Sequence, residues 1–319
     1  MPEKQRLRLE RDGVARLVDH LALGAFATRV RSLRGGGRRR VFEVRWRERG
    51  GRTGRVVVRL APDRGGAETN AVSEFKTLTA LHAAGYPVPR PILVDIEEYF
   101  SRPAIVMQFA GRPVAQPRNR DKWLRCCAEA LASMHAISPA TTDLSHLAPS
   151  SLDERRASQE MSLSVDHLSR FEQDGLIKRV VDAMQQETLR QEPVTMGLVH
   201  EDYWPGNILW RRGRISAVID WTEAALGDPA RDVAQFQIDL SLMYDLEAAV
   251  TFGELYSVAA GVTPANLRYV QLYGIRPALA HLEDWYLPGY VDLGLDLTLP
   301  VLEERFRNYI GWVLDHRAV

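Results

Sequence analysis

Four polar residues, His200, Asp202, Asn207 and Asp220, have types and spacing suited to phosphoryl transfer. Asn207 lies five residues after Asp202, and Asp220 follows thirteen residues later. The transition state of phosphoryl transfer is loose and anionic, so the chemistry needs a group that orients the attacking hydroxyl and oxygen ligands that hold Mg²⁺. We predict that Asp202 orients the hydroxyl and accepts its proton, and that Asn207 and Asp220 bind Mg²⁺.

The surroundings of this motif favour a catalytic role over local hydrogen bonding within a tight turn. With 8 histidines in 319 residues, His-x-Asp-x4-Asn is expected only about 0.008 times by chance. Residues 197–199, 207–210 and 215–219 have the apolar pattern of short strands, and Pro205-Gly206 predicts a turn between the first two. The polar residues therefore fall at strand ends, where oxygen ligands can converge.

Composition narrows the class of protein. A chain of 319 residues exceeds one typical core, which predicts two lobes. The 41 basic and 41 acidic residues balance, which argues against nucleic-acid or membrane binding through bulk charge. No run of eighteen apolar residues and no signal sequence is present, so we expect a cytoplasmic protein. Cys126 and Cys127 are expected to be reduced thiols. The oligomeric state is not predictable from the sequence.

Hydrophobic periodicity predicts an α+β fold with a β-rich front and a mainly helical back. Strands are expected where Phe42, Val44 and Trp46 alternate with charged residues, and over residues 55–61, 92–96 and 104–109. Residues 68–84 are expected to form a helix, and helices dominate beyond Gly111. We place an N-terminal nucleotide-binding lobe at residues 1–109 and a catalytic, substrate-binding lobe at residues 110–319. The nucleotide is expected in the cleft between them.

Arg59 and Glu74 are predicted to form an ion pair. Arg59 alternates with apolar residues of a strand, and Glu74 lies on the apolar stripe of the following helix, where an unpaired carboxylate is costly. An arginine there could grip nucleotide phosphates. The alternative is an edge arginine and a glutamate that leans towards solvent.

Three other patterns are better explained by structure. Gly35-Gly36-Gly37 is more typical of a hairpin turn than of a phosphate-covering loop. The arginines of residues 29–59 alternate with apolar residues, as on the solvent face of a sheet, so nucleic-acid binding is not favoured. Asp228 and Pro229 are predicted to be the N-cap and first residue of a helix.

These segments together resemble the aminoglycoside phosphotransferase family, whose members share a protein-kinase-like, two-lobe fold with choline kinases. The resemblance runs from about Gly24 to about Ser241. The quoted segments are VVVRLAP, SEFKTL, YPVPRPI, IVMQFAGRP, LASMHAI, HEDYWPGN, VIDWTEA and GDPARDVA. The last three, in this order and spacing, are the most specific.

The resemblance implies a role for each matched residue. Asp202 is the catalytic base, Asn207 and Asp220 bind Mg²⁺, and Arg59 and Glu74 serve the nucleotide phosphates. The backbone of Gln108 and Ala110 binds the adenine edge, while Asp232 and His200 support the catalytic loop. The family usually has glycine where Glu201 stands, and Glu201 is expected either to point away from the metal or to repel phosphate.

The predicted function is Mg²⁺-dependent transfer of the γ-phosphoryl group of ATP, or GTP, to a hydroxyl of a small molecule. An aminoglycoside-type antibiotic is the first expectation, with a macrolide or a metabolic alcohol as alternatives, and antibiotic resistance would follow. A catalytically weak nucleotide-binding regulatory module is the alternative of another class. The candidates for an acidic acceptor pocket are Asp166, Asp174, Glu283, Asp284, Asp292 and Asp296; Trp285, Tyr286 and Tyr290 could instead shape an apolar one.

Overall fold

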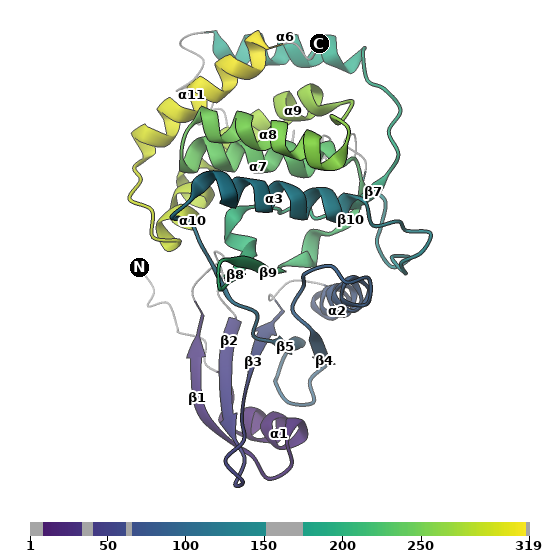
Figure 1. Ribbon diagram of the computed structural model, residues 1–319, viewed down its shortest axis with the longest axis vertical. Coiled ribbons are helices and arrows are strands. Elements are labelled where there is room, and N and C mark those ends of the chain that lie inside the picture. The colour runs from purple at the N-terminus through teal and green to yellow at the C-terminus, as the bar shows by residue number, and fades with distance from the viewer. Residues whose placement is uncertain (1–8, 34–40, 62–65, 151–174, 317–319) are drawn as a thin grey trace.

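The computed structural model describes residues 9–33, 41–61, 66–150 and 175–316. A strand-rich N-lobe lies at one end of the elongated molecule and a helical C-lobe at the other (Figure 1). This arrangement confirms the predicted α+β, two-lobe fold. The proposed division at residue 109 stays a prediction, although the last strand of the N-lobe sheet ends at Gln108.

The N-lobe is a five-stranded antiparallel sheet with the strand order β1-β2-β3-β5-β4. Its elements are α1 (Arg11–Leu21), β1 (Phe26–Ser32), β2 (Val41–Arg47), β3 (Thr53–Leu60), α2 (Ala67–Ala83), β4 (Pro91–Asp95) and β5 (Ala104–Gln108). Helix α2 begins one residue before the predicted helix and ends one residue earlier than it.

Helix α1 was not expected from the strand-rich pattern of this region. It forms because Val14, Leu17 and Val18, at helical spacing, bury one stripe against the sheet. On the facing side of β2, Phe42, Val44 and Trp46 pack into the same cluster, as their alternation predicts.

Two small sheets and a set of helices make the C-lobe. The paired strands are β6 (Arg112–Pro113), β8 (Ile208–Arg211) and β9 (Arg214–Val218), and separately β7 (Gly197–Val199) and β10 (Ala225–Gly227). The helices are α3 (Arg120–His135), α6 (Leu176–Thr188), α7 (Ala230–Met243), α8 (Leu246–Ala260), α9 (Leu267–His281), α10 (Leu287–Asp292) and α11 (Leu299–Asp315), with short turns η1 (Pro205–Asn207), η2 (Trp221–Glu223) and η3 (Leu282–Tyr286). Within the described residues, no helix is both long and apolar enough to cross a bilayer.

One hydrophobic cluster joins the two lobes. Val57 and Leu78 of the N-lobe belong to the same buried cluster as Trp221 and Phe236 of the C-lobe. Trp221 packs edge-on against Tyr86, with 5.9 Å between the ring centroids. The lobes therefore share a core at their junction, and this core fixes β3 and α2 relative to the end of β9.

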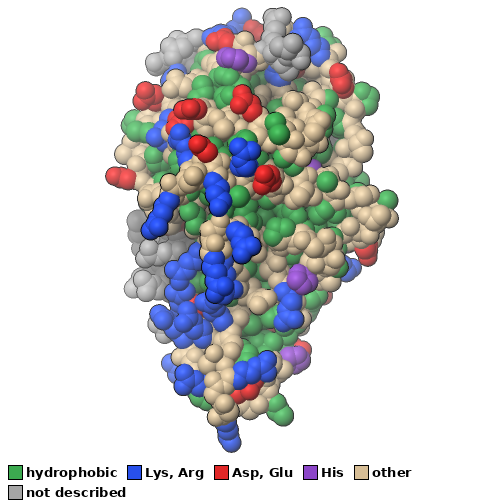
Figure 2. Space-filling model, viewed as in Figure 1, with side chains coloured by type: hydrophobic (Ala, Val, Ile, Leu, Met, Phe, Trp, Pro, Cys, Tyr) green, Lys and Arg blue, Asp and Glu red, His purple; other side chains and the backbone are tan. Residues whose placement is uncertain are grey.

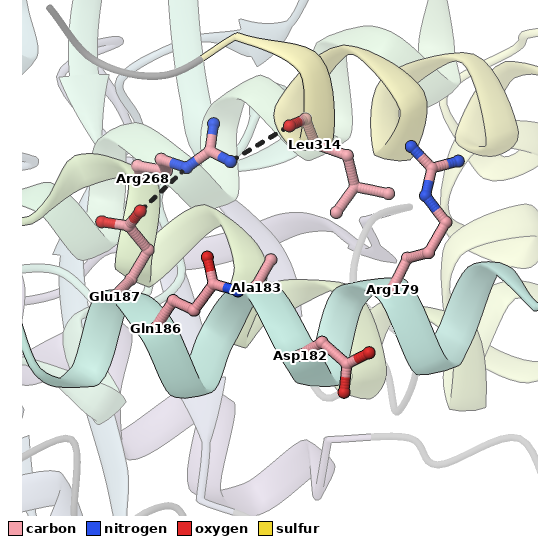
Figure 3. Close-up of a pocket in the computed structure, with 7 residues that line it drawn as sticks. All are labelled: Arg179, Asp182, Ala183, Gln186, Glu187, Arg268 and Leu314. Carbon is pink, nitrogen blue, oxygen red and sulfur yellow. Dashed lines mark hydrogen bonds and ion pairs between the residues drawn. The ribbon is translucent and has the colours of Figure 1, made fainter.

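A cavity of about 210 Å³ lies between α6, α9 and α11, at the end of the C-lobe far from the sheet (Figures 1 and 3). Arg268 crosses it, donates to the carbonyls of Val313 and Leu314 at the end of α11, and pairs with Glu187. Its buried guanidinium therefore caps a helix C-terminus, which is a structural role.

Helix α1 offers a direct test of how the N-lobe core is stabilised. Leu17 is fully buried, so Leu17→Ala should lower the free energy of unfolding by about 2–5 kcal/mol. Leu23, two residues beyond α1, is 91% exposed, so Leu23→Ala should change the free energy of unfolding by less than about 0.5 kcal/mol. Denaturant titration of both variants gives the comparison, and equal effects would contradict the assigned packing.

Candidate active site

Asp202, Asn207 and Asp220 come together at the ends of β7, β8 and β9. The Asn207 amide nitrogen donates to the Asp202 carboxylate at 2.8 Å and to the Asp202 carbonyl at 2.9 Å. The Ile219 N–H donates to the Asn207 carbonyl at 2.9 Å, which brings Asp220 beside the loop. Asp220 has a left-handed backbone with φ 67°, a conformation that is uncommon outside glycine and that turns the chain sharply after β9.

Asp232, on the first turn of α7, holds the catalytic loop through its backbone. Its carboxylate is fully buried and accepts hydrogen bonds from the His200 N–H and the Glu201 N–H, both at 2.8 Å. Burial alone would raise the pKa of Asp232, but the hydrogen bond and charge of His135, with the hydrogen bond from the His200 N–H, outweigh it and lower the pKa. The carboxylate is therefore held as an anion under the loop.

His200 lies inside the loop as a neutral ring. Its Nε2 lies 3.0 Å from the Ile219 carbonyl and its Nδ1 accepts from the Asp202 N–H at 3.2 Å, which assigns the proton to Nε2. Burial lowers the pKa of His200, which agrees with this neutral tautomer. The side chain thus ties the start of the loop to the end of β9.

His135 supports Asp232 from a neighbouring helix. Its Nε2 lies 3.1 Å from the Asp232 carboxylate, and its Nδ1 lies 2.8 Å from the Tyr256 hydroxyl. His135 lies on α3 and Tyr256 on α8, so no local sequence pattern connects them with the loop.

Arg59 pairs with Glu74, as predicted, and also reaches into the C-lobe. Its guanidinium contacts the Glu74 and Asp220 carboxylates and donates to the Thr222 hydroxyl at 2.8 Å. Thr222 in turn donates to Asp220 at 3.0 Å. Glu74 is 2% exposed, so the pair spares it the cost of burial as an isolated charge.

The proposed metal ligands fit a magnesium ion. The Asn207 nitrogen faces Asp202, so the amide oxygen is the atom that could bind a metal. The hydrogen bonds from Arg59 and Thr222 both end on Oδ1 of Asp220, so a metal could share Oδ2. Within the described ranges, no group of three or more His, Cys, Asp or Glu side chains could hold a metal. Two protein oxygens suit Mg²⁺, which keeps waters and phosphate oxygens as its other ligands.

Asp202 is held in an environment that disfavours its charge. Burial raises its pKa well above the ordinary value, and the nearby charges of Asp220 and Asp239 add to the effect. The Asn207 hydrogen bond acts in the opposite direction. Binding of a cation beside Asp220 would offset this repulsion and favour the ionised form that a base requires.

Asp239 was missed by the sequence analysis. It lies two helical turns after Asp232 on α7, is 2% exposed, and has a pKa raised to about 7 by burial. Tyr290 donates to it at 2.7 Å and Gln235 at 3.0 Å, while Gln235 also donates to the Tyr286 hydroxyl. A buried acid and two tyrosines therefore lie near Asp202.

The acidic residues suggested for the acceptor have a different setting. Four of them are exposed on η3, α10 and the following segment: Glu283, Asp284, Asp292 and Asp296. The other two, Asp166 and Asp174, lie outside the described residues. These four exposed residues therefore differ from Asp239, whose carboxylate is buried.

At the connection between the lobes, the Gln108 N–H donates to the Arg90 carbonyl at 2.9 Å. Because this N–H is already bonded, the backbone groups that could meet a nucleotide base here are the Gln108 carbonyl, as an acceptor, and the Ala110 N–H, as a donor.

Glu201 points away from Asp202 and binds Arg231. The two side chains form an ion pair at 2.5 Å with exposed fractions of 4% and 7%. Arg231 also donates to the hydroxyl of Ser150 at 2.9 Å. Glu201 has φ 66°, which explains why glycine suits this position and why a non-glycine residue needs added support.

Asp228 and Pro229 differ by one residue from their predicted places. Helix α7 begins at Ala230 and Pro229 is its N-cap. The Asp228 carboxylate still accepts from the Ala230 N–H at 2.9 Å. The Pro229 backbone already has helical angles, with φ −55° and ψ −24°, so the prediction and the structure differ only in which residue is taken as the first of the helix.

The Glu201–Arg231 pair gives a testable prediction. Arg231→Met should lower the free energy of unfolding by about 3–5 kcal/mol because it leaves the Glu201 carboxylate buried without its partner. Adding Glu201→Gln should recover much of the loss, because it removes the stranded charge. Denaturant titration measures both, with the exposed Arg190→Met as control. No recovery in the double variant would contradict the pairing energy.

Comparison with known proteins agrees with this geometry. The model of the phosphotransferase enzyme family matches residues 29–270. Acyl-CoA dehydrogenase family member 11 from Pongo abelii is 26% identical over 176 residues, covering 52% of this chain and 22% of the relative. This chain thus spans about a fifth of the length of such relatives. Hygromycin-B 4-O-kinase from Escherichia coli is 39% identical over 72 residues, 22% of this chain and 21% of the relative.

Among solved structures, spectinomycin phosphotransferase in complex with ADP and spectinomycin superposes with a TM-score of 0.61. The sequences are 17% identical, and the match covers 95% of this chain and 98% of that one. It shows that the two chains share a fold. With most of its length matched by the family model, this chain belongs to the phosphotransferase enzyme family.

Proposed function

We propose that the protein is a kinase that transfers the γ-phosphoryl group of ATP or GTP to a hydroxyl of a small molecule. The observation that carries the proposal is the convergence of Asp202, Asn207 and Asp220 beside the Arg59–Glu74 pair. This set combines a base, two metal-binding oxygens and a fixed cation for phosphate.

Each residue has a defined task in this proposal. Asp202 orients the acceptor hydroxyl and takes its proton late in transfer. Asn207 and Asp220 would hold Mg²⁺, which supplies charge neutralisation at the transferred phosphoryl group when bound. Arg59, kept in place by Glu74, would bind the nucleotide phosphates, and doing so requires it to share or leave Asp220.

Support for the nucleotide comes from the lobe connection and from a related structure. The Gln108 carbonyl and the Ala110 N–H present one acceptor and one donor at the junction, as a purine edge requires. The spectinomycin phosphotransferase of the same fold was solved with ADP. Both ATP and GTP fit this description.

For the acceptor we propose a hydroxyl-bearing antibiotic of the aminoglycoside type or a similar compound. The matched segment of hygromycin-B 4-O-kinase and the fold shared with spectinomycin phosphotransferase support it. A macrolide or a metabolic alcohol is the alternative acceptor. Asp239 with Tyr286 and Tyr290 would face the acceptor side.

A catalytically weak regulatory module is less well supported. This alternative was considered because a carboxylate at position 201 could repel phosphate. The Glu201 side chain is instead paired with Arg231. The base and both proposed metal ligands are present.

Acceptor-dependent release of nucleoside diphosphate tests the proposal. The wild-type protein is assayed with Mg²⁺ and ATP or GTP against aminoglycosides, macrolides and small alcohols. Asp202→Asn should lower turnover by roughly 10²- to 10⁴-fold and spare nucleotide affinity, because it removes the base and leaves the phosphate ligands. Asp220→Ala should instead weaken the Mg²⁺-dependent part of nucleotide binding.

The two variants act as controls for each other. Unchanged turnover in Asp202→Asn would refute the base, and a metal titration identical to wild type in Asp220→Ala would refute the ligand. Nucleotide binding without turnover on any acceptor would favour the regulatory module.

A further inference from the structure

The face of the N-lobe sheet opposite α1 carries a cluster of arginines around one buried glutamate. Glu43, at the centre of β2, is fully buried. Arg31 of β1 contacts it, Arg45 of β2 donates to it at 3.0 Å, and Arg55 of β3 at 3.3 Å. Figure 2 shows the basic side chains gathered over this part of the N-lobe and the adjoining C-lobe hairpin. We call Arg29, Arg31, Arg45 and Arg55 the arginine face.

Positive charge is in excess on this face. One carboxylate neutralises one of the three guanidiniums that bind it. Arg45 lies directly opposite Arg29 on one side and Arg55 on the other in the strand register, and like charges in such cross-strand pairs repel. In addition, the Nη2 atom of Arg31 is buried with no hydrogen-bond partner. The sheet thus tolerates a repulsion that an anion would relieve.

The side of the sheet that carries the arginine face leads along β3 to the lobe junction. Residues 55, 57 and 59 of β3 alternate onto one side, and on that side Arg59 reaches Asp220 of the C-lobe. The Arg55 guanidinium lies 3.7 Å from the ring centroid of Phe109, in the connection between the lobes. Arg29 is exposed and the Arg45 side chain is 41% exposed, so this part of the face is open to solvent, as the alternation predicts, while Arg55 lies against the lobe connection.

The catalytic residues next to this face are mainly acidic. Among the described residues, the Glu74 and Asp220 carboxylates contact Arg59, and the charges of Asp220 and Glu223 act on Asp202. Before a metal binds, this group would repel an approaching anion such as a nucleoside triphosphate. Arg45 lies opposite Arg55, four residues or roughly 13 Å along β3 from Arg59, which exceeds the Debye length of about 8 Å at physiological salt. The arginines therefore act on a nucleotide that approaches their own side of the sheet, and most strongly at low salt.

We propose that the arginine face captures the anionic nucleotide and guides its phosphates towards Arg59. The inference rests on the proposed nucleotide-binding function and adds an electrostatic step before binding. Charges of one sign beside a low-dielectric junction raise association rates for oppositely charged ligands.

A nucleoside triphosphate fits this face better than a nucleic acid. Binding of single strands needs aromatic side chains on which bases stack. Phe42 and Trp46 of β2 are buried on the opposite side of the sheet, against α1. Phe109 is already covered by Arg55.

Stopped-flow association of a fluorescent ATP analogue tests the proposal. We expect Arg29→Gln/Arg45→Gln to lower the association rate roughly three- to tenfold at low ionic strength, and the difference to fall below about twofold near 0.5 M salt. Arg179→Gln/Arg190→Gln removes the same charge from exposed positions on and just after α6 and should leave the rate unchanged. Uncharged adenosine should bind both double variants as it binds the wild type.

The outcomes separate this inference from the proposed function. A wild-type rate and salt slope in Arg29→Gln/Arg45→Gln would overturn the capture role, and so would an equal loss of adenosine affinity, which would indicate a structural effect. Absence of nucleotide binding in the wild-type protein would overturn the proposed function itself. If the double variant does not fold, Arg29→Gln alone, at an exposed position, should give a smaller decrease in the association rate at low ionic strength.

Discussion

The hydrogen bonds that converge on Asp232 are the constraint on which the site depends. This buried carboxylate accepts from two consecutive backbone amides of the catalytic loop and from His135. A loop with a left-handed residue at position 201 would not keep its shape on local propensity alone. Asp232 is itself fixed by the first turn of α7, so the helix positions the loop, and the loop positions Asp202 and Asn207.

Charge balance completes the arrangement. On one side of the loop, Arg231 neutralises Glu201 and keeps that carboxylate away from the phosphate site. On the other side, Arg59 connects Glu74 of the N-lobe with Asp220 of the C-lobe, so one cation joins the two lobes where phosphates would bind. In the proposed function, the acidic site would serve a divalent cation and the basic face of the sheet an anionic ligand.

Much of this could be predicted from local patterns. The strands around the motif, helix α2 and the Arg59–Glu74 pair follow from alternation and from a carboxylate on an apolar stripe. Helix α1 was missed because only a few apolar residues form its buried stripe. The roles of His135, Arg231 and Asp239 were not predicted because their partners lie on other helices or loops. A contact between distant segments does not alter the local hydrophobic periodicity. The direction of Glu201 could not be predicted for the same reason.

The measurement that tests this account most directly is hydrogen–deuterium exchange of the catalytic loop in Asp232→Asn. Asparagine keeps the shape of the side chain but replaces one acceptor oxygen with a donor, which leaves at least one loop N–H without its partner. We expect the amides of His200 and Glu201 to exchange faster by at least tenfold, while the amides of the N-lobe sheet keep their protection. Unchanged protection at His200 and Glu201 would contradict the role assigned to Asp232.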